Sequence, residues 1–174
     1  MLKQAVGGAL LAALAWAGAT AAQEVEAVGV HNAWSVYQTG SGAGRVCWIR
    51  AAPARQDARR SGQRVSVNRG ETYLTVAARP NDGVRNEVST QIGYTFRQNS
   101  EVRVDIGSSR FTMFTDGDKA WPESPADDDR IVEAMRRGAE AVLTGVSSRG
   151  TTTIDTYSLI GFTAALEQAQ GLCR

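Results

Sequence analysis

Glu87-Val88-Ser89-Thr90-Gln91-Ile92-Gly93-Tyr94-Thr95-Phe96 is the stretch of sequence that decides the fold class. Val88, Ile92 and Phe96 fall on one side of an extended chain, and Glu87 and Gln91 fall on the other. Such alternation is typical of an antiparallel strand with one buried face and one solvated face. The stretch therefore predicts a sheet that covers an apolar core.

The same period of two recurs on both sides of this stretch. The further segments expected to be strands are 34–37, 46–49, 72–77, 102–106, 110–115, 141–146 and 151–157. Short polar breaks at 98–100 and 107–109 predict that the segments from 87 to 114 form a hairpin meander. About eight short strands predict a mainly β fold, either an antiparallel β-sandwich or a barrel.

Two connections between these strands are distinctive. Arg79-Pro80-Asn81-Asp82-Gly83 has the composition of a tight turn. The segment from Gly40 to Gln63 is rich in Gly, Ala, Arg and Ser around Cys47. We expect this segment to contain one long exposed loop.

Two stretches change to a helical period. The first opens with Asp127-Asp128-Asp129 and closes with Arg136-Arg137 before Gly138, which is the charge order that a helix dipole favours. The second, from Phe162 to Cys173, carries one apolar stripe. Its members are Phe162, Ala165, Leu166, Ala169, Leu172 and Cys173. The sequence thus predicts one short helix late in the chain and another at its C-terminus.

The first 22 residues have the composition of a secretory signal peptide. Lys3 precedes a short apolar run, and the small residues Ala19-Thr20-Ala21-Ala22 precede the polar pair Gln23-Glu24. The run is shorter than the roughly 20 residues that a membrane span needs. We therefore expect residues 1–22 to be cleaved during export to the periplasm or the exterior, with no membrane span in the mature protein.

The rest of the chain has ordinary globular composition. Residues 23–33 are expected to form a flexible lead, and residues 34–174 a single β-rich domain. Of the 174 residues 43% are apolar, and 19 basic side chains face 18 acidic ones, for a formal net charge of +1. A chain without a broad cationic field is not expected to bind nucleic acid.

Export changes the interpretation of the two cysteines, Cys47 and Cys173, which lie 126 residues apart. An oxidising compartment favours a disulfide between them, which would tie the C-terminal helix to a central strand. The alternative is two buried free thiols.

The residues that usually carry catalysis are scarce. His31 is the only histidine and falls in the expected flexible lead, so neither a Ser-His-Asp triad nor a common zinc or iron site is supported. Asp116-Gly117-Asp118 and the run Asp127–Asp129 are interpreted as a turn and a helix start. We expect no catalytic residue, no metal and no cofactor.

Three residues are candidates for binding. Trp121 lies in a turn-rich connection, where it could stack on a sugar, anchor a partner, or fold back over one end of the sandwich. Arg149 lies in a polar run and could hold a carboxylate with two hydrogen bonds, that of Asp155 included. Such a clamp would be structural, but the run is also the most plausible place for recognition of a small ligand.

Four short motifs occur in an order that resembles a known family. They are Trp34-Ser35-Val36, Val46-Cys47-Trp48-Ile49, Ala134-Met135 with Gly138, and Ser158-Leu159-Ile160-Gly161-Phe162 with Ala165. The pattern, from Trp34 to Cys173, resembles the invasion-associated locus B family of alphaproteobacterial secreted proteins. Many members carry a further cysteine pair mid-chain, which this chain lacks, so it resembles a divergent branch.

The resemblance implies a β-rich periplasmic or surface protein, linked to host-cell invasion in pathogens, with no established enzymatic activity. Our first hypothesis is accordingly a non-enzymatic exported protein that contacts proteins or glycans of the envelope or host. One alternative is a hydrolase of envelope glycan that uses paired carboxylates. Another is a small enzyme inhibitor that binds through the Gly40–Gln63 segment and its arginines, Arg55, Arg59 and Arg60.

Overall fold

The computed structural model describes residues 24–174, so the signal peptide expected over residues 1–22 lies outside the described residues. Within that range the chain forms strands and two α-helices, which confirms the mainly β, antiparallel fold class. No helix among residues 24–174 is long and apolar enough to cross a membrane.

All the strands of residues 24–174 belong to one antiparallel sheet of 12 strands, more than the eight or so expected. Their bounds are β1 Glu26–His31, β2 Trp34–Thr39, β3 Val46–Ala51, β4 Arg55–Arg60, β5 Gln63–Arg64, β6 Tyr73–Arg79, β7 Val84–Gln91, β8 Glu101–Ile106, β9 Ser109–Asp116, β10 Lys119–Trp121, β11 Glu140–Val146 and β12 Thr152–Ser158. Their order across the sheet is β1-β2-β3-β6-β7-β10-β9-β8-β11-β12-β4-β5.

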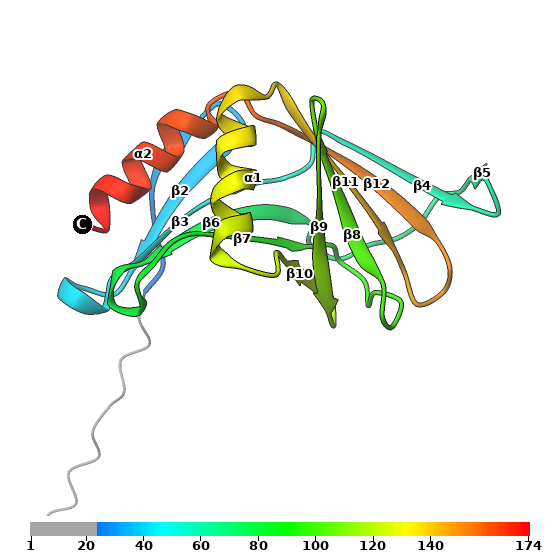
Figure 1. Cartoon of the computed structure of the whole chain (residues 1–174), viewed down its shortest axis with the longest axis horizontal. Coiled ribbons are helices and arrows are strands. Elements are labelled where there is room, and N and C mark those ends of the chain that lie inside the picture. Colours follow the sequence, from blue (N-terminus) through cyan, green and yellow to red (C-terminus); the bar gives the residue numbers. More distant parts are fainter. Residues whose placement is uncertain (1–23) are drawn as a thin grey trace, which may run out of the picture.

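The sheet bends into two halves, as Figure 1 shows. One half contains β2, β3, β6 and β7, and the other contains β8, β9, β11 and β12. Helix α2, Phe162–Leu172, packs on β2 and β3, while α1, Pro125–Arg137, packs on β7 and β9. The inward side chains of both halves and the apolar sides of both helices form one core.

Both helices lie where the sequence predicts them. Ser124 caps α1, because its hydroxyl accepts a hydrogen bond from the Asp127 amide at 3.3 Å. The stripe of α2 is buried, and the edge of one ring of the Trp34–Phe162 pair meets the face of the other with 5.0 Å between centroids. Each fully buried side chain of this size contributes about 1.5–3 kcal/mol to folding.

The disulfide between Cys47 and Cys173 is present. Cys47 lies in β3 and is fully buried, and Cys173 follows the last turn of α2 and is 9% exposed. The bridge therefore fastens the C-terminal helix to a strand inside the sheet, as the sequence predicts. Free thiols are absent from residues 24–174.

The flexible lead expected over residues 23–33 is wrong for most of its length. Residues Glu26–His31 form β1, an edge strand that pairs with β2. The Nε2 atom of His31 lies 2.6 Å from Oε1 of Gln168 on α2, so this histidine is held against the fold. The short apolar pattern of the segment is too weak to reveal a strand that is exposed at the sheet edge.

The strand expected at 46–49 is present as β3, but the long loop expected within Gly40–Gln63 is wrong, because β4 follows β3 after only a short connection. Strand β4 pairs with β12 although Ala58 is its only buried residue. A strand with polar residues on both faces carries no alternation of apolar residues, so its pairing cannot be recognised locally.

The meander expected from residue 87 to 114 is correct only in its second part. Strands β8 and β9 form a hairpin, but β7 pairs with β6 and with the short β10 rather than with β8. The extended period continues to Phe96, yet β7 ends at Gln91 and the chain bends at Gly93, which has φ +74°. A positive φ is a conformation that glycine adopts readily.

Candidate functional site

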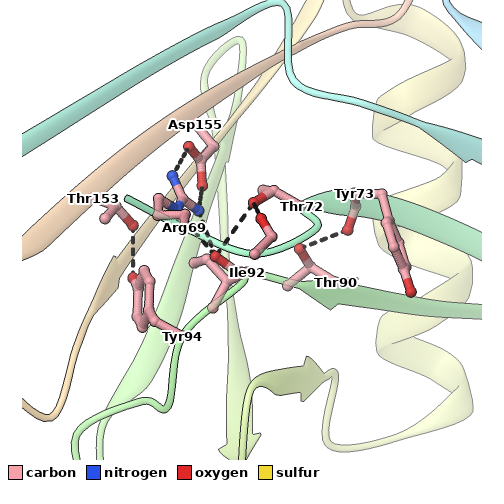
Figure 2. Close-up of polar contacts among 9 residues, drawn as sticks. Arg69, Thr72, Tyr73, Thr90, Ile92, Tyr94, Thr153 and Asp155 are labelled. Carbon is pink, nitrogen blue, oxygen red and sulfur yellow. Dashed lines mark hydrogen bonds and ion pairs between the residues drawn. The ribbon is translucent and has the colours of Figure 1, made fainter. Parts of the chain in front are cut away.

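A buried ion pair links β12 to the connection between β5 and β6, a mostly exposed segment from which the Arg69 side chain enters the interior. Arg69, in this connection, donates from Nη1 to Oδ1 of Asp155 at 2.6 Å and from Nη2 to Oδ2 at 2.7 Å. The Arg69 side chain is 8% exposed and that of Asp155 is 1% exposed. Figure 2 shows the two groups facing each other, with Arg69 also close to the main chain at Ile92.

The Arg69 guanidinium has a second partner at the end of β7. Its Nε and Nη2 atoms donate to the carbonyl oxygen of Ile92 at 3.0 and 2.8 Å. Burial alone lowers the pKa of this group, but the hydrogen bonds and charge of Asp155 outweigh burial and hold the pKa above its ordinary value. Arg69 thus remains charged and connects β12 to the end of β7.

The main chain beside Arg69 is equally constrained. The Gly70 amide donates to the carbonyl oxygen of Gly93 at 2.9 Å, and a Cβ on Gly93 would lie 2.5 Å from the Gly70 oxygen. Only glycine permits so close an approach of two backbones. Arg69 and Gly70 therefore form a support that is held by β12 on one side and by the chain after β7 on the other.

An open hollow of about 510 Å³ lies against this support. Its lining is rich in arginines and hydroxyl groups, and no carboxylate of residues 24–174 contributes to it. The lining residues are Arg60, Ser66, Val67, Asn68, Arg69, Gly93, Tyr94, Thr95, Ser147, Ser148, Arg149, Thr151 and Thr153. We call this feature the arginine–hydroxyl hollow.

Tyr94 and Thr153 form one wall of the arginine–hydroxyl hollow. Their hydroxyl oxygens lie 2.6 Å apart, as drawn in Figure 2, and the Arg69 guanidinium lies 5.3 Å from the centroid of the Tyr94 ring. Burial raises the pKa of Tyr94 to about 12, so its phenol stays protonated at neutral pH. This wall offers neutral hydroxyl groups rather than a base.

The tight turn between β11 and β12 forms another part of the lining. The Gly150 amide donates to the Ser147 carbonyl at 2.8 Å, and the Ser148 amide donates to the Thr95 carbonyl at 2.9 Å. These bonds fix the backbone on both sides of Arg149, whose side chain is exposed. The turn thus holds Arg149 at the edge of the hollow.

The three binding candidates are not brought together. Arg149 lines the hollow, but it does not hold Asp155, which is bound by Arg69 instead. Trp121 lies in β10, outside the lining of the hollow. Its half-buried ring stacks on that of Phe114, which is 40% exposed, with 5.8 Å between centroids.

The acidic runs occupy turn and helix-start positions, as expected. Asp116 and Asp118 flank Gly117 in the turn between β9 and β10. Asp128, in the first turns of α1, accepts a hydrogen bond from the Val88 amide at 2.8 Å. Burial raises the pKa of Asp128 to about 6. Within residues 24–174 no three His, Cys, Asp or Glu side chains are grouped so that they could hold a metal ion.

Arg69 is the residue of this site that the sequence does not reveal. It lies in the polar connection Val65-Ser66-Val67-Asn68-Arg69-Gly70, which has no helical or strand period long enough to interpret. Its partner Asp155 follows 86 residues later. Asp155 shares one side of its strand with Thr151, Thr153 and Tyr157, so the sequence does not mark that side as buried.

The fold and the site together define a class: an antiparallel β protein with a disulfide-anchored C-terminal helix and an internal arginine–carboxylate pair. A sequence profile described as "Invasion associated locus B (IalB) protein" matches residues 34–170. The match covers most of the chain, and the protein therefore belongs to the invasion-associated locus B family.

Comparison of structures shows the same fold. The chain is similar to the crystal structure of invasion associated protein B from Bartonella henselae, with a TM-score of 0.54 and 15% sequence identity. The similarity covers 87% of this chain and 98% of that chain. A search of curated protein sequences found no match to this chain.

Proposed function

We propose that this protein is exported and acts in the periplasm or at the cell envelope by contacting a protein or glycan of the envelope or host, without catalysing a reaction. The arginine–hydroxyl hollow is the contact site in this proposal. Membership of the invasion-associated locus B family and the disulfide support export, because disulfides persist in oxidising compartments.

The observation that carries the proposal is the chemistry of the hollow. It presents cationic and hydroxyl donors on a rigid support, and no histidine, cysteine or carboxylate lines it. Nucleophilic and general acid–base catalysis need an activated nucleophile beside a base. Fixed donors without a base fit recognition of a polar partner.

The test is capture from envelope and host-surface extracts on the immobilised mature protein with its disulfide intact. Three proteins are compared: the wild type, Arg149→Gln in the hollow, and Arg59→Gln as a control. Arg59 is exposed on β4 beside Arg60 and does not line the hollow. We expect the wild type and Arg59→Gln to retain the same component and Arg149→Gln to retain little of it.

Two results would overturn the proposal. The first is the reproducible absence of any retained component from all of these extracts. The second is equal retention by Arg149→Gln and the wild type, which would exclude the hollow as the contact site.

A further inference from the structure

We propose that the arginine–hydroxyl hollow binds an anionic sugar residue, with the oxyanion of the sugar against Arg149 and Arg60 and its hydroxyl groups along the serine and threonine lining. This inference rests on the proposed function and names the chemical class of the partner. The oxyanion can be the carboxylate of a uronic acid or a sulfate ester, and both are accommodated by the same donors.

The arginine–hydroxyl hollow carries positive charge that no carboxylate compensates. Within residues 24–174, Arg60 and Arg149 form no ion pair with a carboxylate. The charge of Arg69 is matched by Asp155, so Arg60 and Arg149 supply the free cations of the lining. Since the whole chain carries a formal net charge of only +1, this is a local concentration of charge rather than a general property.

A third cation borders the turn that holds Arg149. A Cβ at Gly150 would lie 3.3 Å from Nη2 of Arg97, and Arg97 likewise has no ion pair within the described residues. A guanidinium group recognises carboxylate and sulfate oxygens with paired, charge-assisted hydrogen bonds. The rim is therefore suited to an oxyanion.

The side chain of Arg60 is oriented by a hydrogen-bond partner within the protein. Its Nε and Nη2 atoms donate to the hydroxyl oxygen of Thr151 at 3.1 and 2.8 Å. A guanidinium has five N–H donors, so the remaining ones are available to a ligand. Because Thr151 is neutral, it positions Arg60 without cancelling its charge. Less conformational entropy is then lost when a ligand binds.

The composition of the lining favours a sugar over an acidic peptide. Besides its arginines, the lining contains six serine and threonine residues, of which Ser147, Thr151 and Thr153 are buried, together with Asn68, the Tyr94 hydroxyl and Val67 as its one aliphatic side chain. Protein interfaces usually bury aromatic or aliphatic anchors at their centre. A hydroxyl-lined hollow instead complements a ligand that carries many hydroxyl groups.

A second arginine-rich hollow, of about 730 Å³ beside α1, is less suited to an anion. Asp129 and Glu133 are among its lining residues, and its arginines are largely paired. Arg137 pairs with Glu133, Arg130 with Asp127 at 2.9 Å, and Arg110 with Asp105 at 2.9 Å. An oxyanion would have to displace these carboxylates or lie beside them.

The test is isothermal titration of the mature, disulfide-bonded protein with four probes of similar length. These are oligogalacturonate, sulfated dextran oligosaccharide, neutral dextran oligosaccharide and oligoglutamate. We expect binding to at least one anionic oligosaccharide, and the comparison of oligogalacturonate with sulfated dextran identifies the oxyanion. Neutral dextran should not bind, and oligoglutamate should bind at least tenfold more weakly.

Arg149→Gln and Arg60→Gln test the location of binding, with Arg59→Gln as the control that removes the same charge one residue away. Loss of a charge-assisted pair should weaken binding by about tenfold or more in Arg149→Gln and Arg60→Gln, and by less than about twofold in Arg59→Gln. Unchanged thermal unfolding of Arg149→Gln shows that the loss does not come from misfolding.

Three outcomes would overturn the inference: equal weakening by Arg59→Gln and Arg149→Gln, oligoglutamate binding as tightly as the anionic sugars, or no binding of either anionic sugar. If envelope capture persists and still depends on Arg149 while the sugars do not bind, the proposed function stands and only its assignment to an anionic sugar fails. If neither Arg149-dependent capture nor sugar binding is observed, both proposals fail.

Discussion

Arg69 and Asp155 face each other in the interior, and both oxygens of the carboxylate accept from the guanidinium, at 2.6 and 2.7 Å. Arg69 comes from the connection between β5 and β6 and Asp155 from β12, so the pair fastens this connection to β12. The arginine–hydroxyl hollow lies against this segment, and its shape depends on the pair.

Removing one partner of this pair should be strongly destabilising. Arg69→Met leaves a buried carboxylate without its cation, for which the expected cost is about 3–5 kcal/mol of unfolding free energy. The double variant Arg69→Met with Asp155→Leu removes both charges and should be more stable than Arg69→Met alone. Urea unfolding of the two variants measures the difference. If the double variant had a lower unfolding free energy than Arg69→Met, the unpaired carboxylate of Asp155 would not explain the destabilisation by Arg69→Met.

The glycine contact beside the pair gives a second prediction. Gly93→Ala places a Cβ 2.5 Å from the Gly70 oxygen at a φ of +74°. Gly83 has a similar φ of +69°, but a Cβ there meets nothing within 4 Å. Gly83→Ala should therefore cost only the backbone strain, about 1–2 kcal/mol, and Gly93→Ala about 1–3 kcal/mol more. Similar thermal unfolding of both variants would contradict the close approach.

The disulfide should contribute a large share of the stability. It closes a sequence separation of 126 residues and joins β3 to the end of α2. Replacing Cys47 and Cys173 together by Ser should lower the unfolding free energy by about 2–5 kcal/mol. Thermal unfolding of this variant, beside the oxidised and reduced wild type, measures the effect. Equal unfolding temperatures for all three would show that α2 is held by packing alone.

Asp128 should make stability depend on pH. Burial, together with the charges of nearby carboxylates, raises its pKa from 3.8 to about 6, against the opposing effect of the Val88 amide. A raised pKa means that the folded state favours the protonated form. The associated stabilisation is complete below about pH 4 and is lost as the pH rises through about 6.

Asp128→Asn keeps an acceptor for the Val88 amide but removes the charge. After allowance for partial solvent exposure, the variant should be more stable than the wild type by about 1 kcal/mol at pH 7.5 and by much less at pH 4. Urea unfolding at the two pH values measures this. The prediction fails if the difference between the proteins is the same at both.

The sequence predicts the parts of this fold that have a local signal. Alternation over Val88 to Gln91 and the stripe from Phe162 to Leu172 report which faces are buried, and both elements are present. The cysteine pair is predictable because only two cysteines exist and the export expected from the sequence would favour their oxidation.

The elements that the sequence does not predict have no local pattern of apolar residues. Strand β4 is stabilised by backbone hydrogen bonds with β12, and the pattern of its polar side chains does not indicate that pairing. Arg69 and Asp155 are distant in sequence, and nothing near either residue specifies the other. The sequence places Arg149 in a polar turn, because that turn is local, and it names Arg60 only as part of a separate segment. That the two arginines line one hollow follows from the pairing of β4 with β12.

The central proposal is that the protein is exported and then acts as a disulfide-bonded binding protein. Intact-mass measurement of the protein from periplasmic, extracellular and cytosolic fractions of the producing cell, with thiols alkylated at lysis, tests this directly. The account predicts a species in the exported fractions that lacks residues 1–22 and carries no alkyl group. A full-length species in the cytosol with both Cys47 and Cys173 alkylated, and none in the exported fractions, would contradict it.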